Sequence, residues 1–182
     1  SELTKGAFDV TVAPLVNAWG FGPLGDDGPL PSEEHLDQLM PTVGYRHLRI
    51  DPSRSTISKS HPGLHVDLSA IAKGYGVDRV AAALESVGHT DYLVEVGGEL
   101  KASGRRRDGE VWRVAIERPT EEIRLVHRVI LLDDQALATS GDYRNFYEID
   151  GKRRSHTLDP RTGRPGDHGL ASVSVGHDRA TW

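Results

Sequence analysis

Alternation of apolar and polar residues predicts several short strands along this chain. Successive side chains of a strand point to opposite faces, so an alternating run is typical of a sheet with one covered face. Residues 145–149 and the run from Arg153 flank Asp150-Gly151, a two-residue hairpin signal. The other strand-like runs are residues 47–51, 55–58, 64–68, 92–96, 112–116, 125–132 and 171–175.

Helical periodicity is clearest between Ser69 and Gly88, and Gly88 stands where a left-handed cap is wanted. Pro14 occupies a favourable first helical position, and Ser32 can cap a short helix that runs through Leu39. The residues between these two short helices, 20–31, are rich in Gly, Pro and Asp and indicate a connection. Hairpin strands with few helices predict an α+β fold.

Composition narrows the class of protein. The 182 residues are 37% hydrophobic and 27% charged, which is typical of a globular chain with one domain or a compact pair. The net charge of -5 argues against broad nucleic-acid binding. Cysteine is absent, which excludes disulfides, thiolate metal sites and Cys nucleophiles. The first residue is not Met and a strand-like run lies close to the last residue, so we expect a fragment of a longer protein.

The richest candidate for chemistry is the segment 155–165. It places His156, Asp159, Arg161 and Arg164 among turn-forming residues, which indicates a loop that handles an anion. We expect this segment to cross the surface rather than fill a core. A solvated hairpin end is an equally good interpretation of the segment taken alone.

A second candidate lies where residues 67–74 join a strand to the long helix. Free backbone N–H groups and the positive end of a helix favour an anion there, and Lys73 can add a point charge to a phosphate. Asp67 can accept hydrogen bonds from a base or a sugar. The alternative is that Asp67 or Ser69 only caps the helix while Lys73 is solvated.

Two further segments carry weaker signals. Gly97-Gly98 lets the backbone approach a ligand closely, but it also makes a simple tight turn. Thr139 and Ser140 offer hydroxyl groups just after a strand, where they can bond phosphate oxygens or form an ordinary turn. No helical pair of His residues four apart is present, so a zinc site is not expected.

Taken in order, these segments resemble the ApbE family, the FAD:protein FMN transferases. The resemblance covers nearly the whole chain and implies one ApbE-like (T-fold-like) α+β domain over residues 1–182. Besides residues 67–74 and 155–165, the matching motifs are residues 7–17 (AFDVTVAPLVN), 19–23 (WGFGP), 96–98 and 139–145.

The resemblance implies that FMN is transferred from FAD to a Thr or Ser hydroxyl of an acceptor flavoprotein, with release of AMP and a requirement for Mg²⁺. His156 is then the candidate base, because an imidazole with a pKa of about 6.5 can take a hydroxyl proton. Arg161 or Arg164 either stabilises phosphate charge or only pairs with Asp159. The implied FAD contacts are Ala7, Phe8, Asp9, Asp67, Lys73, Thr139, Ser140 and, through its backbone, Leu158; the Ala70 carbonyl is the implied Mg²⁺ ligand.

One departure from the family limits these expectations. The family's other metal ligands, an Asp and a Thr four residues apart, lie on a helix that should begin near Ala180, where this sequence ends. Asp178 is a poor substitute on spacing, so we expect weak Mg²⁺ binding and poor catalysis from this chain alone.

The same residues leave other functions open. The alternatives are an Mg²⁺-dependent FAD pyrophosphatase that yields FMN and AMP, a non-catalytic FAD-binding protein, and a purely structural domain. Family members are often exported and lipid-anchored at the bacterial inner membrane, and their acceptors are often subunits of membrane redox complexes. The localisation of this chain and its acceptor stay open.

Overall fold

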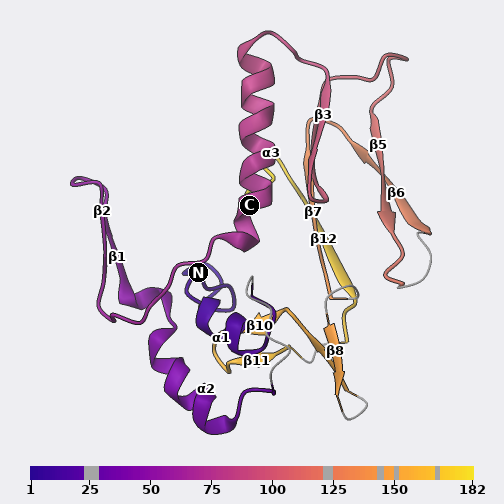
Figure 1. Ribbon diagram of the computed structural model, residues 1–182. Helices are drawn as coiled ribbons and strands as arrows, with labels where there is room; N and C mark the ends of the chain where they lie inside the picture. The colour runs from indigo at the N-terminus through magenta and orange to yellow at the C-terminus, as the bar shows by residue number, and fades with distance from the viewer. Residues whose placement is uncertain (23–28, 121–124, 143–145, 150–151, 167–168) are drawn as a thin grey trace. The chain divides into compact units, whose positions relative to one another are not determined.

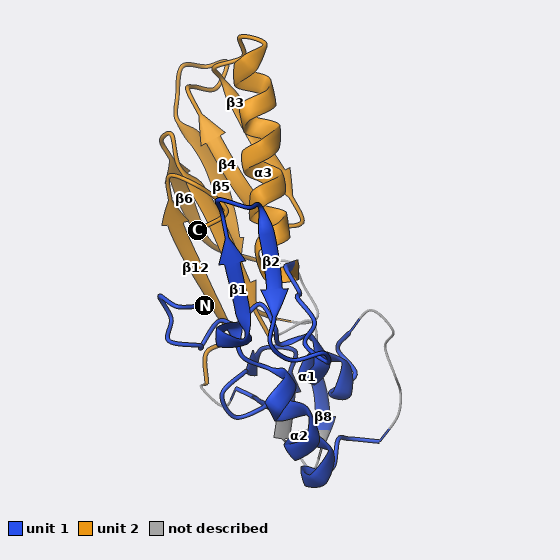
Figure 2. Cartoon of the chain, turned by 90° about the vertical axis from the view of Figure 1, so that its left-hand side faces the viewer, with its two compact units in different colours: residues 1–68, 145–168 blue, residues 69–144, 169–182 orange. Residues whose placement is uncertain are grey.

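The computed structural model describes residues 1–22, 29–120, 125–142, 146–149, 152–166 and 169–182. The chain divides into two compact units, coloured separately in Figure 2. Unit 1 comprises residues 1–68 and 145–168, and unit 2 comprises residues 69–144 and 169–182. Each unit is therefore built from two separate stretches of sequence. The assignment of residues 1–182 to a single domain stays a prediction.

Unit 2 packs one long helix against an antiparallel sheet (Figure 1). The helix, α3 (Ser69–Ser86), confirms the helix predicted from the periodicity, and Gly88 adopts the left-handed φ of +88° expected just beyond its end. The sheet has the order β12-β7-β4-β3, with β3 (Tyr92–Val96), β4 (Glu99–Ser103), β7 (Ala136–Gly141) and β12 (Ser172–His177). A separate hairpin pairs β5 (Trp112–Glu117) with β6 (Val126–Leu132).

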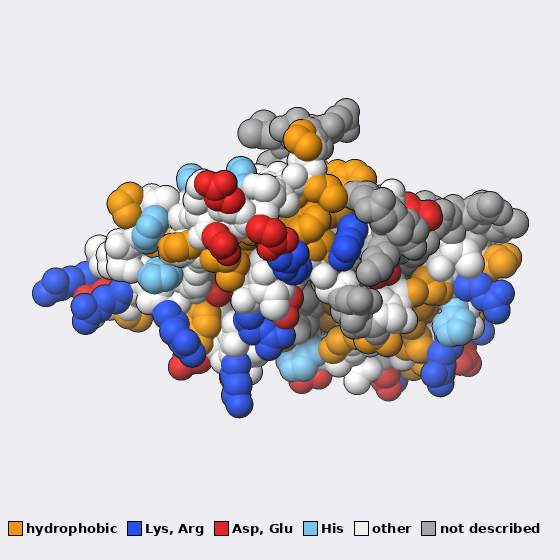
Figure 3. Space-filling model, turned by 90° about the horizontal axis from the view of Figure 1, so that it is seen from below, with side chains coloured by type: hydrophobic (Ala, Val, Ile, Leu, Met, Phe, Trp, Pro, Cys, Tyr) orange, Lys and Arg blue, Asp and Glu red, His pale blue; other side chains and the backbone are white. Residues whose placement is uncertain are grey.

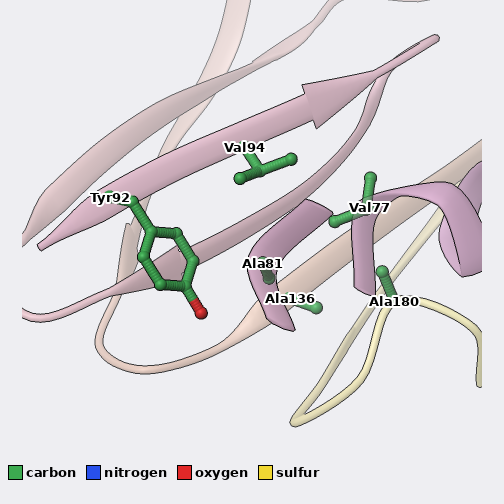
Figure 4. Close-up of a cluster of buried hydrophobic side chains, with 6 residues drawn as sticks. All are labelled: Val77, Ala81, Tyr92, Val94, Ala136 and Ala180. Carbon is green, nitrogen blue, oxygen red and sulfur yellow. The ribbon is translucent and has the colours of Figure 1, made fainter. Parts of the chain in front are cut away.

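Alternation along the strands places apolar side chains on both faces of this sheet. Figure 4 shows the cluster beneath α3, in which Val77 and Ala81 of the helix lie close to Val94 of β3. The opposite cluster joins the sheet to the β5–β6 hairpin through Ala102, Val114, Leu132 and Leu137. The sheet therefore separates two small cores.

Unit 1 consists of short elements around a third apolar cluster, which contains Leu15, Trp19 and Leu36. Ser32 accepts a hydrogen bond from the backbone N–H of His35 at 3.2 Å, which confirms the predicted cap. The helices are α1 (Ala13–Ala18), α2 (Glu33–Leu39) and two 3-10 turns, η1 (Met40–Thr42) and η2 (Tyr45–His47). The strand pairs are β1 (Leu48–Asp51) with β2 (Thr56–Lys59), β8 (Phe146–Ile149) with β9 (Lys152–Ser155), and β10 (Leu158–Asp159) with β11 (Arg164–Pro165).

Most of the predicted strands are confirmed, but the strand predicted over residues 64–68 is wrong. This segment is irregular, with Leu64 buried and both Val66 and Leu68 exposed. The Asp67 N–H donates to the Val10 carbonyl at 2.6 Å, so the segment is fastened to the N-terminal region by a backbone bond without forming a ladder. The expected turn at residues 150–151 lies outside the described residues. No described helix is both long and apolar enough to cross a membrane.

Candidate functional site

The carboxylate of Asp9 is a structural centre of unit 1. The side chain is 6% exposed, and its Oδ1 accepts hydrogen bonds from the backbone N–H of Thr11 at 2.9 Å and from the Thr11 hydroxyl at 2.7 Å. Its Oδ2 accepts from the N–H of Tyr45 at 2.8 Å, and the Thr11 hydroxyl oxygen accepts from Gly44 N–H at 2.6 Å. Asp9 therefore joins the N-terminal segment to the turn at η2. Its contact with FAD stays a prediction.

The segment that holds Ala7 and Phe8 lies beside two other parts of unit 1. A Cβ placed on Gly6 would be 3.9 Å from the ring of Tyr45 and 3.9 Å from Cγ of Arg161. Gly6 has a φ of +87°, a conformation that glycine adopts without strain. Ala7 is exposed and Phe8 half-buried. The N-terminal motif and the 155–165 loop, which the sequence separates by about 150 positions, are therefore neighbours.

Within the 155–165 loop, Asp159 and Arg161 form a closed pair. The Arg161 backbone N–H and Nε each lie 2.9 Å from Asp159 Oδ1, and a second guanidinium nitrogen lies 2.7 Å from Oδ2. The hydrogen bond from Arg161 outweighs partial burial, so the pKa of Asp159 lies below its usual value. Of the two roles considered for Arg161, the structural pairing is the one observed here.

The expectation that this loop only crosses the surface is wrong in part. Gly163 and Pro165 are buried, and the indole N–H of Trp19 donates to the Gly163 carbonyl at 2.8 Å. Leu158 packs against the same apolar cluster, while Arg164 forms an ion pair with Glu33 of α2. The turn signals in the sequence were correct, but the paired strands β10 and β11 anchor the loop on the core of unit 1.

His156 lies in an aromatic setting. It is half-buried, and its ring meets the ring of Phe21 edge-to-face at 6.3 Å between centroids. Phe21 stacks on Tyr147 at 4.8 Å, and the Tyr147 hydroxyl donates to the Gly20 carbonyl at 3.0 Å. The imidazole of His156 is therefore in contact with Phe21, which is itself held by its stacking on Tyr147.

A cavity of about 1090 Å³ in unit 1 has Trp19 and Tyr147 among its lining residues, together with parts of α1, α2 and β8. Tyr147 belongs both to this lining and to the aromatic stack that reaches His156 through Phe21. The lining also includes the polar residues Asn17, Ser32, His35 and Glu148, so it combines apolar and polar surface.

In unit 2, Lys73 on α3 lies over the turn between β3 and β4. Its ammonium is 2.9 Å from the carboxylate of Glu99 and donates to the Gly97 carbonyl at 3.3 Å. The Lys73 side chain is half exposed, whereas Glu99 is buried. Lys73 is therefore half exposed to solvent and also paired with Glu99, and its contact with a phosphate stays a prediction.

Ala70 is exposed on the first turn of α3, three residues before Lys73. Among the described residues, no group of three or more His, Asp or Glu side chains is arranged to hold a metal ion. Mg²⁺ requires near-octahedral coordination by oxygen, which one helix carbonyl cannot provide. The described residues therefore place no cluster of acidic side chains beside the Ala70 carbonyl, and the role of this carbonyl as a Mg²⁺ ligand stays a prediction.

Thr139 and Ser140 lie within β7 rather than just after a strand. As neighbours in a strand they point to opposite faces of the sheet. Ser140 shares its face with Ala136, which packs under α3, whereas the Thr139 hydroxyl lies 2.8 Å from the hydroxyl of Ser174 on β12. A ligand on one face of this sheet can therefore contact only one of these two hydroxyls.

The predicted site residues thus fall into two sets. Unit 1 contains Ala7, Phe8, Asp9, Asp67, His156 and Leu158, and unit 2 contains Ala70, Lys73, Thr139 and Ser140. The sequence analysis did not identify Glu99, whose signal was an acidic residue directly after Gly97-Gly98 at the start of a strand.

Figure 3 shows acidic and basic side chains interspersed on the face that it draws.

Comparisons with known proteins agree with this architecture. A sequence model of the ApbE family matches residues 1–182, and the chain belongs to this family. A FAD:protein FMN transferase of Vibrio cholerae is 51% identical over 173 residues, which cover 95% of this chain and 51% of that protein. The Escherichia coli protein of the same name is 45% identical over 174 residues, with 94% of this chain and 50% of that protein covered.

Solved structures confirm the α+β fold. The apo flavinyl transferase ApbE of Pseudomonas stutzeri matches with a TM-score of 0.86 at 45% identity, covering 98% of this chain and 54% of that one. The flavin transferase ApbE of Vibrio cholerae gives a TM-score of 0.87 at 48% identity, and the match covers 99% of this chain and 56% of that one. The chain thus spans about half the length of the relatives that it matches.

Proposed function

We propose that this chain is part of an enzyme that transfers FMN from FAD to a Thr or Ser hydroxyl of an acceptor protein. One observation of unit 1 carries the proposal. The N-terminal motif, Asp67 and the 155–165 loop were identified separately in the sequence. In unit 1 a Cβ placed on Gly6 would lie 3.9 Å from Cγ of Arg161, and the Asp67 N–H donates to the Val10 carbonyl, so the three segments are neighbours. The names of the relatives support the same activity.

In the proposed reaction, the acceptor oxygen attacks the phosphorus on the FMN side of the FAD pyrophosphate. A new P–O bond forms, the bridging P–O bond breaks, and AMP leaves with the bridging oxygen. His156 takes the proton of the attacking hydroxyl, since a nearby imidazole can act as a base close to neutral pH. Lys73 offers positive charge to a phosphate oxygen, where developing negative charge needs stabilisation.

We propose that the transfer also depends on Mg²⁺. The backbone carbonyl of Ala70 is the ligand of this chain that we assign to the cation. The described residues contain no cluster of acidic side chains that could complete the coordination. We therefore expect Mg²⁺ to bind this chain weakly. Isothermal titration with Mg²⁺ tests the expectation, and tight binding by the 182-residue chain would contradict it.

The activity is tested by mass spectrometry of an acceptor peptide that carries a target Thr, after incubation with FAD, Mg²⁺ and the protein. A mass gain equal to FMN, with AMP released, supports the transferase. A peptide with Val in place of the target Thr is the control and should gain nothing. AMP without a mass gain would indicate a pyrophosphatase, and FAD binding without AMP a non-catalytic flavin-binding protein.

The role of His156 is tested with His156→Gln, which keeps a polar side chain of similar size. We expect FMN transfer to fall by about a hundredfold or more, since a positioned acid–base group contributes that much to a rate, while FAD binding persists. His89→Gln changes an exposed histidine of unit 2 and serves as the matched control. Equal transfer rates for the two variants would remove His156 from the mechanism.

A further inference from the structure

We infer that Glu99 is a positioning residue that holds the Lys73 ammonium in place to receive a phosphate oxygen of FAD. The inference rests on the proposed function, because it takes the pyrophosphate of FAD as the anion. It adds a residue that lies outside the predicted site. Glu99 acts through Lys73 and is not itself assigned a contact with FAD.

Burial makes Glu99 depend on this lysine. Glu99 is 8% exposed at the start of β4, and an ionised carboxylate in such a place needs a compensating charge. Its Oε2 accepts no hydrogen bond of good geometry from the described residues, and the ammonium of Lys73 lies 2.9 Å from it. The attraction between the two charges therefore draws the lysine toward the sheet.

The turn at Gly97 limits where the lysine stem can lie. A Cβ on Gly97 would be 2.7 Å from Cδ of Lys73, so the stem rests directly on the glycine backbone. Gly97 also has a φ of +57°, a left-handed conformation that disfavours other residues. The stem is thus confined by the turn while its ammonium is held by Glu99 and the Gly97 carbonyl.

Counting donors leaves one hydrogen of the ammonium for a ligand. A lysine ammonium has three N–H donors. One is directed to the Gly97 carbonyl and the charge of Glu99 occupies another side, while the side chain as a whole is 47% exposed. The ammonium therefore keeps one donor for a ligand near the beginning of α3, where a helix terminus also favours an anion.

Lys101, the lysine on β4, is paired with a different carboxylate. Lys101 lies two residues after Glu99 on the same face of the strand, and its ammonium is 4.0 Å from the carboxylate of Asp78. Its side chain is 20% exposed, compared with 47% for Lys73. Lys101 therefore serves as a control cation that shares the strand face but has its own carboxylate.

The test is a double-mutant cycle on FAD affinity, measured by quenching of flavin fluorescence with the 182-residue chain. Glu99→Gln and Lys73→Met should each weaken FAD binding by about tenfold, the factor expected from the loss of one well-placed charged hydrogen bond. In the Lys73→Met background, Glu99→Gln should change the Kd no further, because Glu99 acts through the lysine. Lys101→Met should leave the Kd unchanged.

A pair of glycine variants separates positioning from folding. Gly97→Ala places a methyl group against Lys73 without touching Glu99 and should weaken FAD binding as Glu99→Gln does. Gly98→Ala also strains a positive φ, of +95°, but its Cβ meets nothing within 4 Å, so the FAD affinity should be retained. Equal effects of the two glycine variants would overturn the inference.

Two other results would also overturn it. One is an unchanged Kd for FAD in Glu99→Gln, and the other is an equal loss of FAD affinity on Glu99→Gln in the wild-type and Lys73→Met backgrounds. Either would show that Glu99 does not act through the lysine, and the proposed function would stand. A wild-type chain that binds no FAD would overturn the proposed function and this inference together.

Discussion

At the scale of single residues, Asp9 shows how one side chain can shape a candidate ligand site from within the fold. Both of its carboxylate oxygens accept hydrogen bonds from the protein, and the partners come from Thr11 and Tyr45. Removing the carboxylate would leave buried donors without partners, which costs more than the loss of an exposed contact. Asp9 therefore contributes to the stability of unit 1 before any ligand binds.

We expect Asp9→Ala to lower the free energy of unfolding by about 1–3 kcal/mol, the cost of leaving buried donors unsatisfied. Urea unfolding followed by circular dichroism measures the change. Asp37→Ala on α2 is the control, since this acid is exposed and surface substitutions usually change stability by less than about 0.5 kcal/mol. Equal stabilities of the two variants would contradict the structural role of Asp9.

Tyr92 gives a second prediction at this scale. Burial, together with a hydrogen bond at 2.5 Å from its hydroxyl to Glu85, raises the pKa of Tyr92 to about 12 from an ordinary value of 10.0. The neutral phenol is thus favoured by folding, so its contribution is complete below about pH 10 and is lost as the pH rises toward about 12.

Urea unfolding across that alkaline range should show a loss of stability that Tyr92→Phe reduces. Tyr75→Phe is the matched control, because Tyr75 is on the exposed surface of α3. If the free energy of unfolding fell with pH at the same slope in wild type and in Tyr92→Phe above about pH 10, the raised pKa of Tyr92 would be contradicted.

How much the sequence could predict at this scale depends on whether a residue's partner is nearby in the chain. Lys73 follows a helix start, so local chemistry was enough to single it out. Glu99 lies 26 positions further on, and the pairing exists only because α3 packs on β3 and β4. Trp19 and Gly163 are joined in the same way by folding.

At the scale of elements, hydrophobic periodicity located α3 well but misassigned residues 64–68. Alternation predicts which face of a strand is buried, but a strand also needs a neighbour with free backbone groups. Asp67 N–H bonds to Val10, and the segment continues directly into α3 at Ser69. The N-terminal segment that receives this bond was not foreseeable from local pattern.

Two glycines of α3 provide a matched test of helix packing. A Cβ on Gly74 would be 2.1 Å from the carbonyl oxygen of Ala180, whereas one on Gly76 would meet only Cγ1 of Val96 at 3.8 Å. Gly76→Ala should stabilise the chain by up to about 1 kcal/mol through helix propensity. Gly74→Ala should destabilise it by about 1–3 kcal/mol through overpacking, despite the same gain.

Thermal unfolding of the two variants is the measurement. If both substitutions raised the midpoint equally, the close approach of residue 180 to α3 would be refuted.

At the scale of the whole molecule, acidic groups in both units link stability to pH. Burial opposes the ionisation of Asp78, but hydrogen bonds from Thr181 and Ala180, with the charge of Lys101, outweigh it and lower the pKa of Asp78. The pKa of Asp159 is likewise lowered by Arg161. Such groups stabilise the fold above their ordinary pKa of 3.8, and this stability is lost as the pH falls through the lowered folded value.

We therefore expect the free energy of unfolding to fall below about pH 4, and Asp78→Asn to flatten that dependence while lowering stability at neutral pH. Acid titration monitored by circular dichroism tests this, with Glu34→Gln on the exposed side of α2 as the control. An acid transition that is identical in wild type and Asp78→Asn would assign the pH dependence to other groups.

The division into two units was the feature least accessible to sequence pattern. Neither a linker nor a change of composition marks residue 68 or residue 144 in the sequence. Long-range contacts such as that between Asp78 and residues 180–181 define the units, and no local signal encodes them.

This interleaved path also sets an order for synthesis on the ribosome. Residues 69–144 emerge after the first part of unit 1 but before residues 145–168 that complete it. The hydrogen bond from Trp19 to the Gly163 carbonyl therefore cannot form until most of unit 2 has been synthesised. The sheet of unit 2 is in turn incomplete until β12 has been synthesised. Nascent chains stalled between these points would expose apolar surface and should bind chaperones more strongly than the finished chain.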